Sequence, residues 1–318
     1  MTTPLLPQEI YLLERYSSPE YYSQMRDAWE AMLKHVEDCL DRFMRQLPPD
    51  YRARPQPLQP DIVWGQRVIP IFRDTMQDLN TGVIKLTHGD LGGLLKGTVS
   101  NDFRGQVEFS SDWMDEVEPG AADKYWKLIG QASTLAFNID MTVGAYWNKG
   151  ALAVRYSPDA RGPLNPPPAW PRYRLNPDVQ VRTGEPVLHT GIYLPDLDDS
   201  NAQFLLASRH YRYAHTCPPA SVGYDPQTQD VSEAPALWTL VERVPGETVP
   251  LEEGLGGLPV ALHVYAGQPC PRAGFWFTLA RHGSRRHFEQ GEIFPAIPSE
   301  TTVGLTLWQW DPDQASTT

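Results

Sequence analysis

The sequence predicts an α+β protein, with an N-terminal helical bundle followed by a C-terminal, mainly antiparallel β domain. In the first half of the chain, apolar residues recur at three- and four-residue steps, which is typical of amphipathic helices. In the second half, short segments rich in branched and aromatic residues are separated by turn signals. Proline is also unevenly divided, with 10 in residues 1–150 and 21 in residues 151–318.

These differences predict two domains, a helical domain at 1–150 and a β-rich domain at 151–318. Between them lies a proline-rich linker at about 157–172. Proline lacks a backbone N–H and has a fixed φ, so we expect this stretch to form neither a helix nor a central strand. We expect either a linker or an extended run along the surface there.

The first long helix is expected to begin at Pro19. Ser18 precedes it as a hydroxyl N-cap, and Glu20 places a carboxylate in the first turn. Apolar residues then recur on one face until Leu47, and Pro48 with its following proline ends the helix.

Two further helices complete the predicted bundle. One runs from Asp61 to about Leu79 and is expected to be kinked or interrupted at Pro70. The other runs from Pro119 to about Trp147. Three long helices with facing apolar stripes should pack together. The glycine-rich stretch between the second and third helix, residues 89–105, is expected to form a loop or short strands.

The second half contains segments with strand composition, which predict a twisted antiparallel sheet with long loops. They lie at residues 191–196, 202–208, 237–244, 259–267, 274–280 and 302–311. In the last segment, Trp308 and Trp310 are two residues apart and therefore share one face of the strand. We expect both indole rings to lie in the core.

The net charge limits the classes of partner. The chain has 318 residues with 27 Lys and Arg against 39 Asp and Glu, which gives a net charge of −12. A dedicated nucleic-acid-binding protein needs a basic face to neutralise phosphates, so no nucleic-acid partner is predicted.

The cysteines and apolar segments bear on the compartment. Cys39, Cys217 and Cys270 are far apart and include no CxxC pair, which argues against a disulfide framework and favours reduced thiols in the cytoplasm. The N-terminal residues lack the pattern of a secretory signal. The longest mostly apolar helical stretch contains Asn138 and Asp140, which makes it too polar to span a membrane. We therefore expect a cytoplasmic protein that does not associate with a membrane.

Known catalytic and ligand motifs are incomplete in this sequence. The segment GGLLKGT at 92–98 lacks the Gly-Lys-Ser/Thr order of a phosphate-binding loop. The acidic run beginning at Asp196 has Ala207 where a calcium loop needs glutamate. His210 and His215, even with the nearby cysteine, would need a further ligand from elsewhere to bind a metal. No metal and no cofactor are predicted.

Two acidic clusters are candidates for a surface that meets a basic partner. They consist of Asp112, Asp115, Glu116 and Glu118, and of Asp196, Asp198 and Asp199. The first cluster also lies just before a predicted helix, where the helix dipole favours negative charge. A structural role therefore competes with a binding role for these four residues.

The C-terminal segments resemble a known group of proteins. Three segments are similar to immunity proteins of bacterial polymorphic toxin systems, families seventy-one and seventy-two. They are CPRAGFWFTLARHGSRRHFEQGEIFPAI at 270–297, TLWQWD at 306–311, and residues 183–208. The positions that carry the resemblance are Gly274, Trp276, Phe277, Arg285, Arg286, Phe288, Gly291, Trp308 and Trp310.

The resemblance implies a role without catalysis. Such a protein binds a cognate toxin, often one delivered by a type VI secretion system, and thereby protects its own cell in the cytoplasm. The signature positions are expected to be mostly structural, and no catalytic residue is carried over. An acidic protein suits an inhibitor of a basic toxin, because opposite charge speeds encounter and sets orientation. The acidic clusters are the expected toxin-binding residues.

Two other functions are compatible with the sequence. Arg285, Arg286 and His287 belong to the main basic cluster, and an enzyme could use them to bind a small phosphorylated or anionic substrate. Alternatively, the chain could be an adaptor or chaperone for a secreted effector. A homodimer is compatible with the sequence, but no sequence feature indicates the number of subunits.

Overall fold

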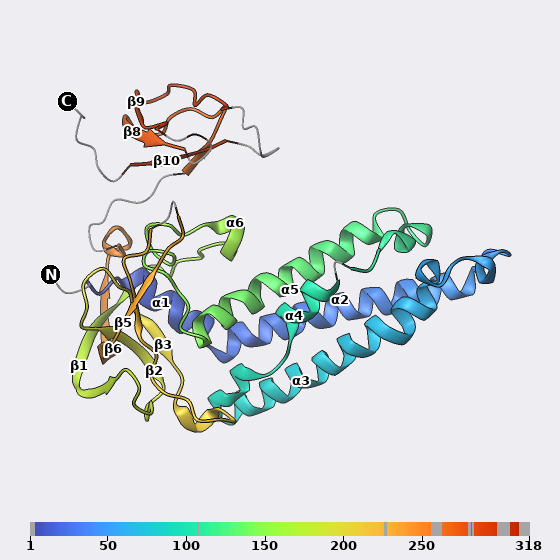
Figure 1. Cartoon of the computed structure of the whole chain (residues 1–318), viewed down its shortest axis with the longest axis horizontal. Coiled ribbons are helices and arrows are strands. Elements are labelled where there is room, and N and C mark those ends of the chain that lie inside the picture. Colours follow the sequence, from blue (N-terminus) through green and yellow to red (C-terminus); the bar gives the residue numbers. More distant parts are fainter. Residues whose placement is uncertain are drawn as a thin grey trace.

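The computed structural model describes residues 4–106, 108–225, 228–255, 263–278, 281, 283–297 and 306–311. Helices occupy the N-terminal part of the chain and antiparallel sheets follow, as Figure 1 shows. The predicted α+β class, with a helical N-terminus and a C-terminal β domain, is confirmed.

Three long helices lie side by side and extend away from the first sheet (Figure 1). They are α2, α3 and α5, and shorter helices precede, join and follow them. The helices are α1 (Pro7–Tyr16), α2 (Pro19–Arg45), α3 (Ile69–Thr87), α4 (Val99–Gln106), α5 (Ala121–Val143) and α6 (Pro158–Arg161).

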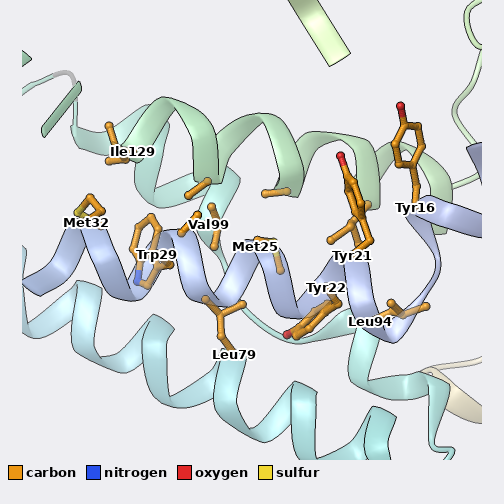
Figure 2. Close-up of a cluster of buried hydrophobic side chains, with 14 of the residues drawn as sticks. Tyr16, Tyr21, Tyr22, Met25, Trp29, Met32, Leu79, Leu94, Val99 and Ile129 are labelled. Carbon is orange, nitrogen blue, oxygen red and sulfur yellow. The ribbon is translucent and has the colours of Figure 1, made fainter. Parts of the chain in front are cut away.

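The start of α2 follows the predicted capping pattern. The Ser18 hydroxyl accepts a hydrogen bond from the backbone N–H of Tyr21 at 3.1 Å, and Pro19 occupies the first helical position. Along α2, buried residues lie on the sides that face the other helices. Figure 2 shows Tyr22 directed towards α3, whereas Tyr21 is directed to the opposite side of α2. Tyr16, the last residue of α1, points to that same side.

The second predicted helix is longer than expected. A π-helical segment, η3 (Asp61–Val68), leads directly into α3, and the helix continues to Thr87 instead of ending near Leu79. The helix type changes two residues before Pro70. Proline has no N–H for a bond to the preceding turn, and the wider π turn is one way for a helix to accommodate that loss.

The prediction of a loop or short strands at 89–105 was wrong. The segment contains a 3₁₀ turn, η4 (Leu91–Leu95), and most of α4. Its glycines allow close packing of the turn on α3. A Cβ added to Gly93 would lie 2.5 Å from the carbonyl oxygen of Gly82, so a side chain there would force the two elements apart.

The first sheet packs against the helices and shares their core. Its order is β1-β6-β2-β3, with all neighbours antiparallel. Ile192 pairs with Val241 on one side and with Phe204 on the other, and all three belong to the same buried cluster as the helical residues. The strands are β1 (Trp170–Arg182), β2 (Gly191–Pro195), β3 (Gln203–Leu205) and β6 (Leu237–Val249).

The prediction that the proline-rich segment at 157–172 forms no helix was wrong, because it contains the short helix α6 as well as the first residues of β1. Pro158 lies at the start of α6, where a helix does not need the missing N–H. β1 is an edge strand, and its register is irregular between Pro171 and Tyr173 and again between Asn176 and Gln180. Proline is tolerated at edges and bulges because fewer ladder hydrogen bonds need its missing N–H.

A second four-stranded sheet forms the C-terminal unit, which we define as the described residues from 263 to 311. Its order is β7-β10-β8-β9, and its strands are β7 (His263–Tyr265), β8 (Gly274–Phe277), β9 (Arg286–Phe288) and β10 (Leu307–Trp310). This unit has its own buried cluster, in which Trp308 is 1% and Trp310 5% exposed. The prediction that both tryptophans are core residues is confirmed. A separate two-stranded sheet pairs β4 (Ala220–Val222) with β5 (Ser232–Ala234).

Candidate functional site

The first acidic cluster lies at the beginning of α5, at the end of the bundle that is remote from the first sheet (Figure 1). We call Asp112, Asp115, Glu116 and Glu118 the tip acids; all four are exposed. The Asp115 carboxylate accepts a hydrogen bond from the backbone N–H of Ala122 at 3.0 Å. It therefore caps the first turn of α5, where the helix dipole favours a negative group.

Two other tip acids form ion pairs with arginines. Glu118 lies 2.9 Å from Arg42 of α2, and Glu116 lies 3.4 Å from Arg54. These pairs are in contact with water and contribute little to stability, but they hold the carboxylates in place. Asp112 is exposed, and no side chain among the described residues pairs with its carboxylate.

The second acidic cluster lies in the turn between β2 and β3. We call Asp196, Asp198 and Asp199 the turn acids; all three are exposed. The Asp196 carboxylate accepts a hydrogen bond from the backbone N–H of Leu237 at 2.8 Å, and Asp199 forms an ion pair with Lys149. Asp199 has a φ of 57°, in the left-handed region that aspartate tolerates better than most residues.

The fold separates the two acidic clusters. The tip acids precede α5, whereas Lys149, the partner of a turn acid, follows the end of α5. A helix of 23 residues is about 35 Å long. The structure therefore provides two acidic surfaces, one near each end of α5, instead of one continuous patch.

The residues that carry the family resemblance lie in the C-terminal unit. Trp276 packs edge-on against Trp310 at 5.3 Å between ring centroids, and Phe288 packs against Trp308 at 4.8 Å. Gly291 has a φ of +88°, which favours glycine. Gly274 is buried at the first position of β8, and Phe277 is half-buried at its last. These positions build the unit's interior and turns.

The paired arginines of this unit are held by neighbouring groups. The Arg285 side chain forms an ion pair with Asp311 and stacks 4.0 Å from the centre of the Phe275 ring. Arg286 stacks 4.1 Å from the centre of the Phe288 ring and lies 3.4 Å from a Glu292 oxygen.

A cavity of about 430 Å³ adjoins these arginines and is also lined by Pro295, Ile297 and Trp308. The enzyme alternative needs guanidinium groups that are free to bind a substrate. Here the guanidinium groups of Arg285 and Arg286 already contact carboxylates and aromatic rings.

A buried carboxyl group that the sequence analysis missed lies between α1 and the first sheet. Glu9 is 2% exposed and accepts a hydrogen bond from the backbone N–H of Ala202 at 2.9 Å. Burial raises the pKa of Glu9 to about 7, although the Ala202 N–H and the positive charge of Lys149 act in the opposite direction. The available signal was an acid within the apolar stretch around Ile10, but the packing partner could not be identified from sequence.

The three thiols are buried, and their environments disfavour nucleophilic chemistry. Burial raises the pKa of Cys39, Cys217 and Cys270, and that of Cys217 reaches about 12. A raised pKa keeps a thiol protonated and therefore less reactive.

Among the described residues, no group of three or more His, Cys, Asp or Glu side chains is arranged to hold a metal ion. The described helices also include none that is long and apolar enough to cross a membrane.

Comparison of the chain with protein-family models, curated proteins and solved structures finds no match. The resemblance to immunity proteins therefore depends on the residues named in the C-terminal segments alone.

Proposed function

We propose that this chain is an immunity protein, which binds a cognate toxin in the cytoplasm and inhibits it without catalysis. The observation that carries the proposal is the position of the resembling residues. Trp276, Phe288, Trp308 and Trp310 form the closed aromatic core of a small β unit, which is a scaffold role and not a catalytic one. This is the role that the resemblance implies for them.

The exposed carboxylates support a binding role. With a net charge of −12, the protein attracts a basic toxin over a distance, and the fixed acids at the two ends of α5 orient the encounter. A standard interface covers about 800 Å² of each partner, which is roughly 30 Å across. One compact toxin domain therefore covers the tip acids or the turn acids, but not both.

The direct test uses the gene next to the one that encodes this chain. Cells that express the neighbouring gene product alone should stop growing, and co-expression of this chain should restore growth. The two purified proteins should also form a complex. Failure to restore growth, together with failure to form a complex, would refute the proposal. A complex without restored growth would indicate an adaptor or chaperone.

Charge-neutralised variants identify the surface. One variant neutralises three tip acids, a second the three turn acids, and a third provides a control at exposed acids elsewhere, so that each changes the net charge by the same amount. The tip variant carries Asp112→Asn, Glu116→Gln and Glu118→Gln, and the turn variant carries Asp196→Asn, Asp198→Asn and Asp199→Asn. The control variant carries Asp74→Asn, Asp78→Asn and Glu252→Gln.

The association rate of each variant with the toxin is measured at rising salt. We expect one acidic-cluster variant to associate about tenfold more slowly than the control at low salt, with a weaker salt dependence. Equal rates for all three variants would exclude both clusters as the steering surface. A wild-type association rate that does not change with salt would show that electrostatic steering does not contribute to binding.

A further inference from the structure

A cavity of about 650 Å³ opens between α2, α5 and the segment that follows α6. This volume lies within the range of small-molecule binding sites in proteins. Its apolar wall includes Ala28, Leu128, Leu135 and Pro163. Its polar lining residues include Arg15, Tyr21 and Arg161.

Two arginines line this cavity without a carboxylate partner. Among the described residues, no Asp or Glu forms an ion pair with Arg15 or Arg161. Asp27 also lines the cavity, but it lies 2.9 Å from Arg26, which is not a lining residue. In a protein with a net charge of −12, two arginines that line one cavity and have no carboxylate partner among the described residues suggest a site for an anion.

Neighbouring groups hold both arginines in place. One Nη of Arg15 donates a hydrogen bond to the carbonyl oxygen of Leu164 at 2.8 Å. The Arg161 guanidinium stacks against the rings of Phe137 and Trp147, with its carbon 4.8 and 4.7 Å from their centres. Burial lowers the pKa of Arg161, because the charged form loses contact with water. A bound anion would compensate for that loss.

A buried hydrogen-bond network supports the cavity wall. Asn138 is completely buried, and its amide nitrogen donates to the Tyr21 hydroxyl at 2.8 Å and to the Arg161 carbonyl oxygen at 3.0 Å. The Tyr21 oxygen therefore accepts from Asn138, which leaves its own proton free to donate to a ligand. Figure 2 shows the hydroxyl groups of Tyr16 and Tyr21 directed to the same side of the bundle.

We propose that this cavity binds a small anionic molecule with an apolar body, a carboxylate or a phosphate ester. The guanidinium groups of Arg15 and Arg161 bind the anion, the Tyr21 hydroxyl donates to it, and the apolar wall contacts the rest of the molecule. This binding is separate from the proposed inhibition of a toxin.

A matched pair of fluorescent probes tests the site. Anilinonaphthalene sulfonate is an anion with an apolar body, and N-phenylnaphthylamine has nearly the same body without the charge. We expect the sulfonate to bind the full chain at one site. Arg15→Gln and Arg161→Gln should each weaken its affinity by about tenfold, the loss expected for a charge-assisted contact, and should affect the neutral probe much less.

Two further variants keep the test interpretable. Arg209→Gln is the control, because Arg209 also donates to a backbone carbonyl, that of Leu188 at 3.1 Å, but does not line the cavity. Ala31→Trp places an indole in the cavity from an exposed position of α2, and the alanine methyl group that it replaces makes no hydrogen bond. It should block both probes, whereas Arg209→Gln should block neither.

Several outcomes would overturn the proposal: no binding of the sulfonate, binding that survives Ala31→Trp, or equal losses of both probes in Arg15→Gln and Arg161→Gln. If the site is confirmed, competition by naphthoate and by naphthyl phosphate shows which anion it prefers. Displacement by either one supports the proposal, and failure of both to displace the sulfonate contradicts it.

Discussion

Replacing Glu9 with glutamine should change how the stability of the protein depends on pH. The carboxyl group is buried between α1 and the first sheet, where it accepts the hydrogen bond from the Ala202 N–H. Burial, the main cause, raises its pKa from 4.5 to about 7. The amide oxygen of Glu9→Gln can accept the same hydrogen bond, but this side chain cannot ionise.

The sign and size of the effect follow from proton linkage. Between pH 4.5 and about 7, the folded protein keeps a proton on Glu9 that the unfolded chain releases. The stabilising contribution of this group is therefore complete below pH 4.5 and is lost as the pH rises through about 7. At about 1.4 kcal/mol per unit of pKa, the loss amounts to about 3 kcal/mol.

Urea unfolding followed by helical circular dichroism measures this effect. The free energy of unfolding of Glu9→Gln minus that of the wild type should rise by about 3 kcal/mol over this pH interval and then remain constant. The difference between the two proteins removes the contributions of all other titrating groups. The exposed Glu20→Gln is the control and should show a nearly constant difference. Parallel curves for Glu9→Gln and wild type would refute the reasoning.

Three other predictions concern the framework. In Gly82→Ala, the new Cβ would lie 2.6 Å from the Cζ atom of Tyr22, so the free energy of unfolding should fall by at least about 1 kcal/mol in thermal or urea unfolding. In Gly130→Ala in α5, the added atom has open space, so the free energy of unfolding should rise by about 0.5–1 kcal/mol. A rise in both variants would contradict the packing argument. Ser18→Ala removes the cap of α2 and should cost about 1 kcal/mol, with Ser18→Asp retaining most of the stability. Trp276→Ala empties the centre of the C-terminal unit and should cost that unit about 3–5 kcal/mol. The aromatic circular dichroism should fall in part, since the tryptophans of the helical core stay packed, and the helical signal should be retained. Loss of the helical signal as well would show that the unit does not unfold separately.

Local patterns predicted the elements whose formation depends on local interactions. α2 begins at the predicted proline because Ser18 supplies an acceptor for the first-turn N–H groups, and a long apolar stripe then requires one helix face to be buried. Apolar patterns also predicted α5 and most of the short strands. The alternating tryptophans of β10 likewise identified the core of the C-terminal unit.

The missed elements depend on tertiary partners. α1 was not predicted, because its ten residues are too few to form a stable helix alone and its buried face is defined by the sheet. β1 contains Pro171 and Pro177, which argue against a strand until its edge position and irregular register are known. α4 lies within a glycine-rich stretch, in which glycines allow close packing against α3 and do not mark a loop.

The sequence by itself determined the α+β class, the long helices, the aromatic interior of the C-terminal strands and the acidic character of the surface, because composition and periodicity record which residues need burial. Only the tertiary structure decided which charges are paired. The fold pairs Glu118 with Arg42, buries Glu9 between α1 and the first sheet, and places Arg15 and Arg161 in the lining of one cavity. Residues so distant along the chain meet only through the packing of helices on one another and on the sheet, which no local pattern specifies.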